Sequence, residues 1–194
     1  MKTQKKPLII NDKEYDVIVD IFYDDDLKAV CSIYSRWSEL SKDLNKLGCR
    51  KINFPEISEI FFCIVDKSWR VNSKSIPGEH SSFDCYNPHR KTRIQVKSAS
   101  SENELTSFGP KSKWDELYFL DFFNDGNYDG TFEIYQIPTN LVYEWVVSKE
   151  QNITFVERQL EGKRPRFSLR SLIESNEIKP MKIVNLCELV DELD

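Results

Sequence analysis

The chain has 194 residues, of which 40% are hydrophobic, 12% aromatic and 30% charged, and this balance excludes a disordered or low-complexity protein. The length fits a single domain over residues 1–194 better than two, with a sizeable buried core. The net charge is −5, so the chain will not coat nucleic acid or an anionic membrane nonspecifically, and binding to DNA requires a local basic patch.

No apolar run approaches the roughly 18 residues of a membrane span, and the apolar run at residues 8–10 is too short for a secretory signal. The five cysteines have no close pairs and there are only two histidines, so neither a disulfide framework nor a zinc site is expected. A bound metal therefore needs oxygen ligands, which suits Mg²⁺. We expect a cytoplasmic protein with no membrane partner.

Two helices are predicted in the first third of the chain. Apolar residues recur there at three- and four-residue steps, which predicts a helix over residues 26–47 that Gly48 ends. A shorter helix follows Pro55, and its apolar face covers residues 57–65. Glu59 lies near the edge of that face.

The middle of the chain changes to the two-residue period of strands. Strands are predicted over residues 82–86 and 93–97, joined by the turn-forming residues 87–92. Residues 117–122 are almost continuously apolar, as in a strand that is buried on both faces.

The last third of the chain mixes both kinds of element. A turn at residues 124–130 leads into a strand over residues 131–137. Helices are predicted over residues 138–147 and 168–176, and a last strand over residues 181–186. This order predicts an α/β fold in which a mixed central β-sheet is flanked by helices.

The two strands of the predicted hairpin carry Asp84 on one side and Gln95 and Lys97 on the other. Residues two apart in a strand face the same side, so Gln95 and Lys97 project together, and the hairpin brings Asp84 beside Gln95. Hydrolysis of a phosphodiester with a hard cation needs these groups. The carboxylate anchors the ion, and the lysine orients or deprotonates the attacking water and offsets the developing charge. The alternative is a surface hairpin whose Asp and Lys are simply exposed.

Three features of the context favour the catalytic interpretation. The hairpin adjoins the buried strand at residues 117–122, and Glu59 on the upstream helix offers a further carboxylate. Small and polar residues at 98–101 follow Lys97, where a chain can pass close to a phosphate.

The hairpin resembles the PD-(D/E)xK nuclease core, in the sequence Phe83-Asp84, the ten residues that follow, and Gln95-Val96-Lys97. From about residue 28 to residue 171 the chain is similar to a small orthodox Type II restriction endonuclease of the group that cuts GC-any base-GC sites. The further segments that carry this similarity are Arg36-Trp37 and residues 53–59, 114–121 and 162–168. The chain has Phe83 where proline is common and Gln95 where an acid is usual, which makes the motif a QxK variant.

The resemblance implies a restriction-endonuclease-like core and Mg²⁺-dependent, sequence-specific cleavage of both DNA strands at a short GC-containing palindrome. It implies that Asp84, Gln95 and the Val96 carbonyl bind Mg²⁺ and that Lys97 serves the attacking water. Glu59 matches a helix carboxylate that several such enzymes use as a further metal-shell or relay residue. A capping or surface glutamate is the equal alternative for Glu59.

Contacts with DNA are expected from the basic segment at residues 158–170, which holds five lysines and arginines and one acid, Glu161. Arginine binds guanine with two hydrogen bonds, and any cation can contact a phosphate. The candidates are Lys163, Arg164, Arg166 and Arg170, followed by Arg50, Lys51, Lys111 and Lys113. The alternative is a solvated helix face and a polar loop.

Three functions remain open. The first is a restriction endonuclease that acts on double-stranded DNA as a homodimer, because a palindrome needs two equivalent active sites, with a cognate methyltransferase as its genetic partner. The second is a repair or junction-resolving nuclease on the same fold, which reads DNA shape. The third is a catalytically dead DNA-binding module marked by Gln95, although Lys97 in register favours activity.

Overall fold

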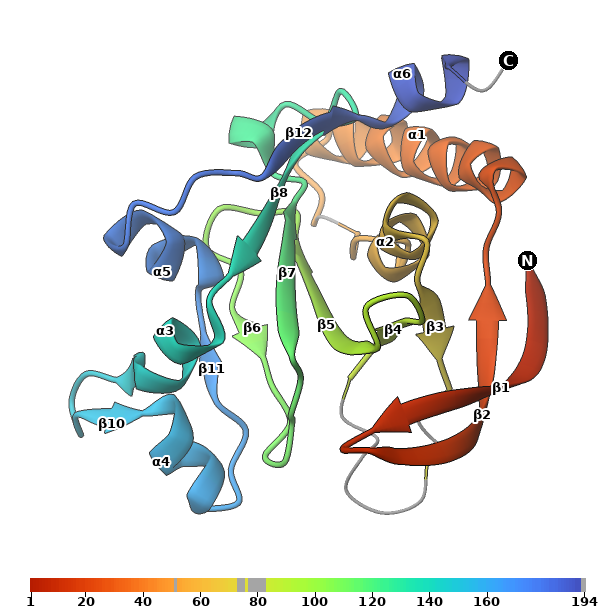
Figure 1. Cartoon of the computed structure of the whole chain (residues 1–194). Coiled ribbons are helices and arrows are strands. Elements are labelled where there is room, and N and C mark those ends of the chain that lie inside the picture. The colour runs from red at the N-terminus through yellow and green to blue at the C-terminus, as the bar shows by residue number, and fades with distance from the viewer. Residues whose placement is uncertain (51, 73–75, 77–82, 193–194) are drawn as a thin grey trace.

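One eight-stranded sheet forms the centre of the computed structural model, which describes residues 1–50, 52–72, 76 and 83–192 (Figure 1). The strand order is β1-β2-β3-β4-β5-β7-β8-β12, and each neighbouring pair is antiparallel except β5 and β7, which are parallel. The predicted mixed sheet is therefore confirmed. Its strands are β1 (Lys2–Ile10), β2 (Lys13–Ile21), β3 (Trp69–Val71), β4 (Cys85–Asn87), β5 (Thr92–Ala99), β7 (Glu116–Asp121), β8 (Thr131–Ile137) and β12 (Lys182–Asn185).

Helices cover the two faces of this sheet, as Figure 1 shows. One face packs against α1 (Asp24–Lys46), α2 (Ser58–Asp66) and α6 (Leu186–Asp191). The other face packs against α3 (Thr139–Glu144), α4 (Phe155–Leu160) and α5 (Leu169–Ser175), together with the short strands β6 (Thr106–Ser107), β9 (Val146–Ser148), β10 (Ile153–Thr154) and β11 (Arg166–Phe167). A short 3-10 helix, η3 (Asn124–Gly126), lies in the predicted turn.

The side chains of β7 alternate between two hydrophobic cores. Tyr118 and Leu120 belong to the core under α1 and α2, whereas Leu117 and Phe119 belong to the core under α3, α4 and α5. The prediction that this strand is buried on both faces is confirmed. The same alternation on β5 places Val96 in the α1–α2 core, so that Gln95 and Lys97 project from the opposite face.

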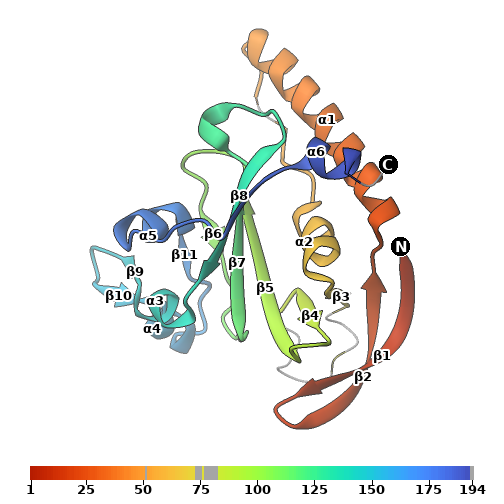
Figure 2. The ribbon, with the colours of Figure 1, turned by 45° about the horizontal axis from the view of Figure 1, so that its top comes forward.

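Helix α1 confirms the first predicted helix, although it begins at Asp24 instead of residue 26. The Asp26 carboxylate accepts a hydrogen bond from the backbone nitrogen of Tyr23 (2.9 Å), which ties down the first turn. Gly48 follows the helix with a φ of +68°, a conformation that glycine adopts at low cost. Figure 2 shows α6 lying against α1, near both ends of the chain.

The sequence predicted no structure for residues 1–25, but most of them form the hairpin of β1 and β2. Leu8 and Val17 from the hairpin are fully buried against Phe83 and Tyr86. The available signal was Asn11-Asp12 between two apolar runs, because both residues have a positive φ in the tight turn. The hairpin extends the sheet beyond the part of the chain that sequence reasoning covered.

Two other boundaries differ from the predictions. The helix predicted over residues 138–147 ends at Glu144, because Val146 leaves it to pair with Thr154 in the β9–β10 ribbon. The strand predicted from residue 82 is represented by β4, and Ser82 itself lies outside the described residues. The helix and strand predicted near the C-terminus are confirmed as α5 and β12.

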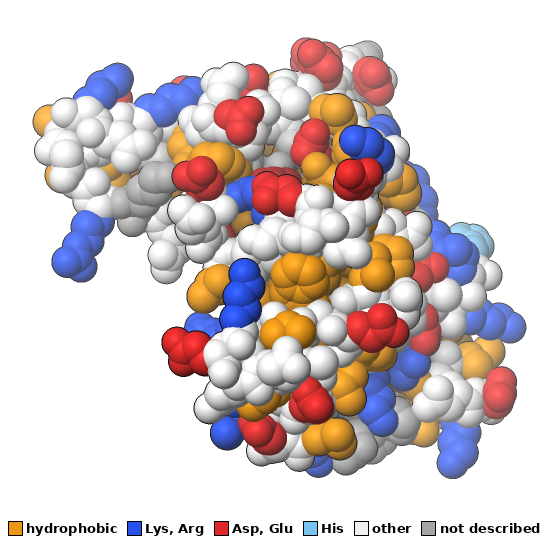
Figure 3. Space-filling model, turned by 90° about the vertical axis from the view of Figure 1, so that its left-hand side faces the viewer, with side chains coloured by type: hydrophobic (Ala, Val, Ile, Leu, Met, Phe, Trp, Pro, Cys, Tyr) orange, Lys and Arg blue, Asp and Glu red, His pale blue; other side chains and the backbone are white. Residues whose placement is uncertain are grey.

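Figure 3 shows the face that carries α3, α4 and α5, where hydrophobic side chains gather in the middle with acidic and basic side chains around them. Over the described residues, no helix combines the length and the apolar character that crossing a membrane requires.

Candidate active site

Asp84 directly precedes β4, and its carboxylate is tied to the neighbouring strand β5. The backbone nitrogen of Val96 donates to Asp84 Oδ2 at 2.9 Å, and the side-chain nitrogen of Gln95 donates to the same oxygen. Burial raises the pKa of Asp84, against the opposing effects of the Lys97 charge and the Val96 hydrogen bond. The hairpin thus brings Asp84, Gln95 and Lys97 together as the sequence predicted.

The Gln95 side chain is 3% exposed, and it turns its amide nitrogen toward Asp84. In this orientation Gln95 is a donor to the carboxylate. Rotation of the amide about its last torsion exchanges nitrogen and oxygen, so the same position can offer an oxygen to a cation.

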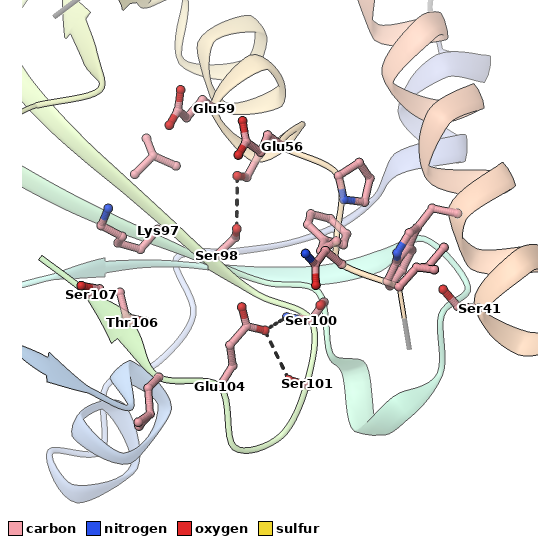
Figure 4. A pocket seen from close by; sticks show the side chains of 18 of the residues that line it. Ser41, Glu56, Glu59, Lys97, Ser98, Ser100, Ser101, Glu104, Thr106 and Ser107 are labelled. Carbon is pink, nitrogen blue, oxygen red and sulfur yellow. Dashed lines mark hydrogen bonds between the residues drawn. The ribbon is translucent and has the colours of Figure 1, made fainter. Parts of the chain in front are cut away.

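Glu59 lies in the first turn of α2, near the part of β5 that carries Lys97 (Figure 4). Burial, followed by the negative charge of Asp84, raises the pKa of Glu59 from 4.5 to about 7. The positive charges of Arg70 and Lys97 oppose that increase. Asp84 and Glu59 are therefore two carboxyl groups with raised pKa values that lie close enough to Lys97 to be influenced by its charge.

Two cavities adjoin each other at Lys97 and Ser107, which line both. The smaller has a volume of about 310 Å³, and its walls include Asp84, Gln95 and Arg164. The larger, of about 530 Å³, runs along the polar chain after Lys97 and reaches Glu59 (Figure 4). Together they form a polar cleft, which we call the Asp84–Glu59 cleft.

The predicted DNA-binding residues fall into two groups. Lys111 and Arg164 line the smaller cavity with Asp84, and Arg164 Nε donates to Ser107 Oγ at 3.2 Å. Arg170 instead forms an ion pair with the buried Asp121 and donates to backbone oxygens of the loop after β5.

Of the remaining basic candidates, those that the structure describes line neither cavity. Lys163 is paired with Glu161 at 3.1 Å, while Arg50 and Arg166 are exposed. Lys113 lies in the same loop as Lys111, and Lys51 lies outside the described residues.

Sequence reasoning missed Ser107, which lines both cavities, and the buried Phe108, which follows it. Ser107 contacts Arg164, and the Phe108 ring lies 5.5 Å from the Lys97 ammonium. The only local signal was the turn-forming pair Gly109-Pro110 that follows them. Their place beside Lys97 depends on the pairing of β6 with β11, which joins segments about 60 residues apart.

Comparisons with known proteins point to one group of enzymes. A family model described as the Bsp6I restriction endonuclease matches residues 22–176. The Type II restriction enzyme Bsp6I of Bacillus sp. (strain RFL6) is 30% identical to this chain over 167 residues, which cover 84% of this chain and 88% of that relative. No solved structure matches the chain.

Proposed function

Since the chain belongs to the Bsp6I restriction endonuclease family, we propose that it is a Type II enzyme whose Mg²⁺-dependent hydrolysis cuts both strands of DNA at a short GC-containing palindrome. The observation that carries this proposal is the cavity in which Asp84, Gln95 and Lys97 meet two cations, Lys111 and Arg164. A DNA strand brings one phosphate per nucleotide, and this cavity offers cations for the phosphates beside the groups that hydrolysis requires.

We assign Asp84, Gln95 and Lys97 to a PD-(D/E)xK motif in its QxK form. The site fits a hard cation because its donors are oxygens and because two nearby carboxyl groups have raised pKa values, which a positive ion would lower. Among the described residues, no three Asp, Glu, His or Cys side chains are placed so that they could hold a metal ion together. The ligands we propose are therefore Asp84, the Gln95 amide oxygen, the Val96 carbonyl and water, with Glu59 in the surrounding shell.

Bound Mg²⁺ supplies polarisation of the phosphoryl oxygen and a lower pKa for the attacking water. The protein groups do the remaining work. Lys97 orients the water and offsets the charge that develops on the phosphate, and Arg164 and Lys111 hold the neighbouring phosphates. Gln95 holds the Asp84 carboxylate by its amide N–H, and its amide oxygen would be a ligand if Mg²⁺ were bound.

A palindromic site requires two equivalent active sites, so we propose that the enzyme acts as a homodimer. A cognate methyltransferase is the expected genetic partner, because an active restriction enzyme endangers unmodified DNA in its own cell.

Incubation of the purified protein with plasmid DNA and Mg²⁺ tests this function. A restriction enzyme gives discrete fragments whose ends map to one sequence, whereas a junction-resolving nuclease nicks structured DNA and a dead binding module leaves the plasmid intact. Asp84→Asn is the matched control, because it keeps the shape of the side chain and removes the charge. Fragments that appear equally with this variant would contradict the assignment of the site.

A further inference from the structure

We propose that Phe108 is a positioning residue whose ring holds the Lys97 ammonium in place for the cleavage reaction. This inference rests on the proposed function, since it concerns the lysine of the same site. The Nζ atom of Lys97 lies over the Phe108 ring, 5.5 Å from its centroid, which is within the range of a cation–π contact.

The Phe108 ring is a fixed platform. It is 1% exposed and stacks on Phe167 with an interplanar angle of 14° and a centroid distance of 5.6 Å. The ring centroids of Trp114 and Phe155 lie 5.3 and 5.2 Å from the centroid of the Phe108 ring. The backbone nitrogen of Phe108 donates to the carbonyl of Pro165 at 3.0 Å, so both the ring and the chain that carries it are held.

The lysine needs such a platform because its stem has four rotatable bonds, and its charge is attracted by two carboxylates. The field of Lys97 acts on both Asp84 and Glu59. A free ammonium could therefore approach either carboxylate. The negative face of a rigid aromatic ring adds a third attraction with a defined position, and it leaves the three N–H donors of the ammonium available to water and phosphate.

The site also explains why the platform is aromatic. Phe108 belongs to the hydrophobic core under α3, α4 and α5, where a carboxylate would lose its hydration at a large cost in free energy. An aromatic ring packs well in that core, and its face still attracts the Lys97 ammonium. Leucine would also pack well in the core, but it would not attract the ammonium.

Fluorinated phenylalanines at position 108 test the proposal, because fluorine weakens the negative face of the ring while its size changes little. We expect 3,4,5-trifluorophenylalanine at this position to lower kcat for DNA cleavage about tenfold, with mono- and difluoro analogues between it and the parent. The dissociation constant for cognate DNA in EDTA and the thermal midpoint should stay unchanged, which a merely structural role for Phe108 does not predict.

Phe155 is the matched control, because its ring is fully buried and packs edge-on against Phe108. The same analogue at position 155 should change kcat less than twofold. A flat series at position 108 in an active enzyme, or an equal loss at position 155, would overturn this inference alone. A parent protein that does not cut DNA would overturn the proposed function and this inference together.

Discussion

The half-buried carboxylate of Asp84 accepts two hydrogen bonds from β5 and has a raised pKa, so its charge costs the fold stability, and the function proposed above makes it a ligand of the cation. We therefore predict that Asp84→Asn and Lys97→Ala each lower cleavage at least 100-fold, corresponding to about 3 kcal/mol or more in the barrier. Urea denaturation of the metal-free variants should show Asp84→Asn to be at least as stable as the parent. Near-normal cleavage by either folded variant contradicts the assignment.

Glu59 gives the site a defined pH dependence. Its pKa is about 7 in the folded protein against 4.5 as the reference, so between these values the folded state binds more protons than the unfolded chain. The free energy of unfolding of the metal-free protein should therefore fall as the pH rises through this window, by about 3 kcal/mol at most from this group. Glu59→Gln should remove that dependence.

Melting curves at pH 5 and pH 8, with and without Mg²⁺, measure this effect. Added Mg²⁺ should raise the thermal midpoint more at pH 8, where Glu59 is ionised. An unchanged pH dependence in Glu59→Gln would assign the titration to Asp84 instead.

The residues of the site differ in how far the sequence alone could predict them. Asp84, Gln95 and Lys97 follow from strand periodicity and hairpin length, because both are local properties of the chain. The donor orientation of the Gln95 amide depends on the position of Asp84 in space. The contacts of Ser107 and Phe108 depend on the pairing of β6 with β11, which no local pattern encodes.

At the scale of elements, Arg164 and Arg170 lie in one basic segment but belong to different structures. Arg170 joins α5 to Asp121 at the end of β7 and to the loop after β5. Arg164 lies before β11 and reaches the cavity of Asp84. The same residue type in the same segment is thus placed for two roles.

We predict that Arg164→Ala and Arg170→Ala separate these roles. Arg170→Ala should lower the free energy of unfolding by about 3 kcal/mol, because Asp121 then stays buried without its partner. Arg164→Ala should keep that free energy and weaken DNA binding, with the slope of log K against log salt reduced by about 0.9 if it contacts one phosphate. Chemical denaturation and binding titrations at several salt concentrations measure both. Equal stability losses in the two variants would contradict the separation.

The elements that the sequence predicted correctly carry strong local patterns, as α1 and β7 do. The hairpin of β1 and β2 was missed because its strands are polar on one face and its turn is short. The outer edge of β1 is nevertheless blocked at Pro7 and Ile9. The Tyr86 hydroxyl accepts a hydrogen bond from the backbone nitrogen of Ile9 and donates one to the Ile9 carbonyl oxygen. Pro7, two residues earlier on the same edge, has no backbone N–H to donate to another strand. This edge of the sheet is therefore poorly suited to pairing with another strand.

At the scale of the whole molecule, the proposed homodimer needs a surface that places two clefts on one DNA. The face over α3, α4 and α5 adjoins the cleft, since Gln159 of α4 bonds the backbone of Gly109 and Ser112 in the wall of the Asp84 cavity. A cavity of about 350 Å³ on this face includes Leu141 and Trp145 in its walls. The apolar centre of this face suits contact with a second copy.

Glu144 and Lys149 are exposed at the rim of that cavity, and in a two-fold contact each can face the other residue type of the second copy. We predict that the parent has twice the chain mass in light scattering, and that Glu144→Lys and Lys149→Glu each weaken the dimer about tenfold. A 1:1 mixture of the two variants should restore dimers, because one chain then carries lysine and the other glutamate at both positions, so that the charges are opposite across both symmetric contacts. Lys13→Glu, on the distant hairpin, is the control for the change in net charge. If neither reversal shifts the monomer–dimer equilibrium more than this control does, the two copies meet on another surface of the molecule.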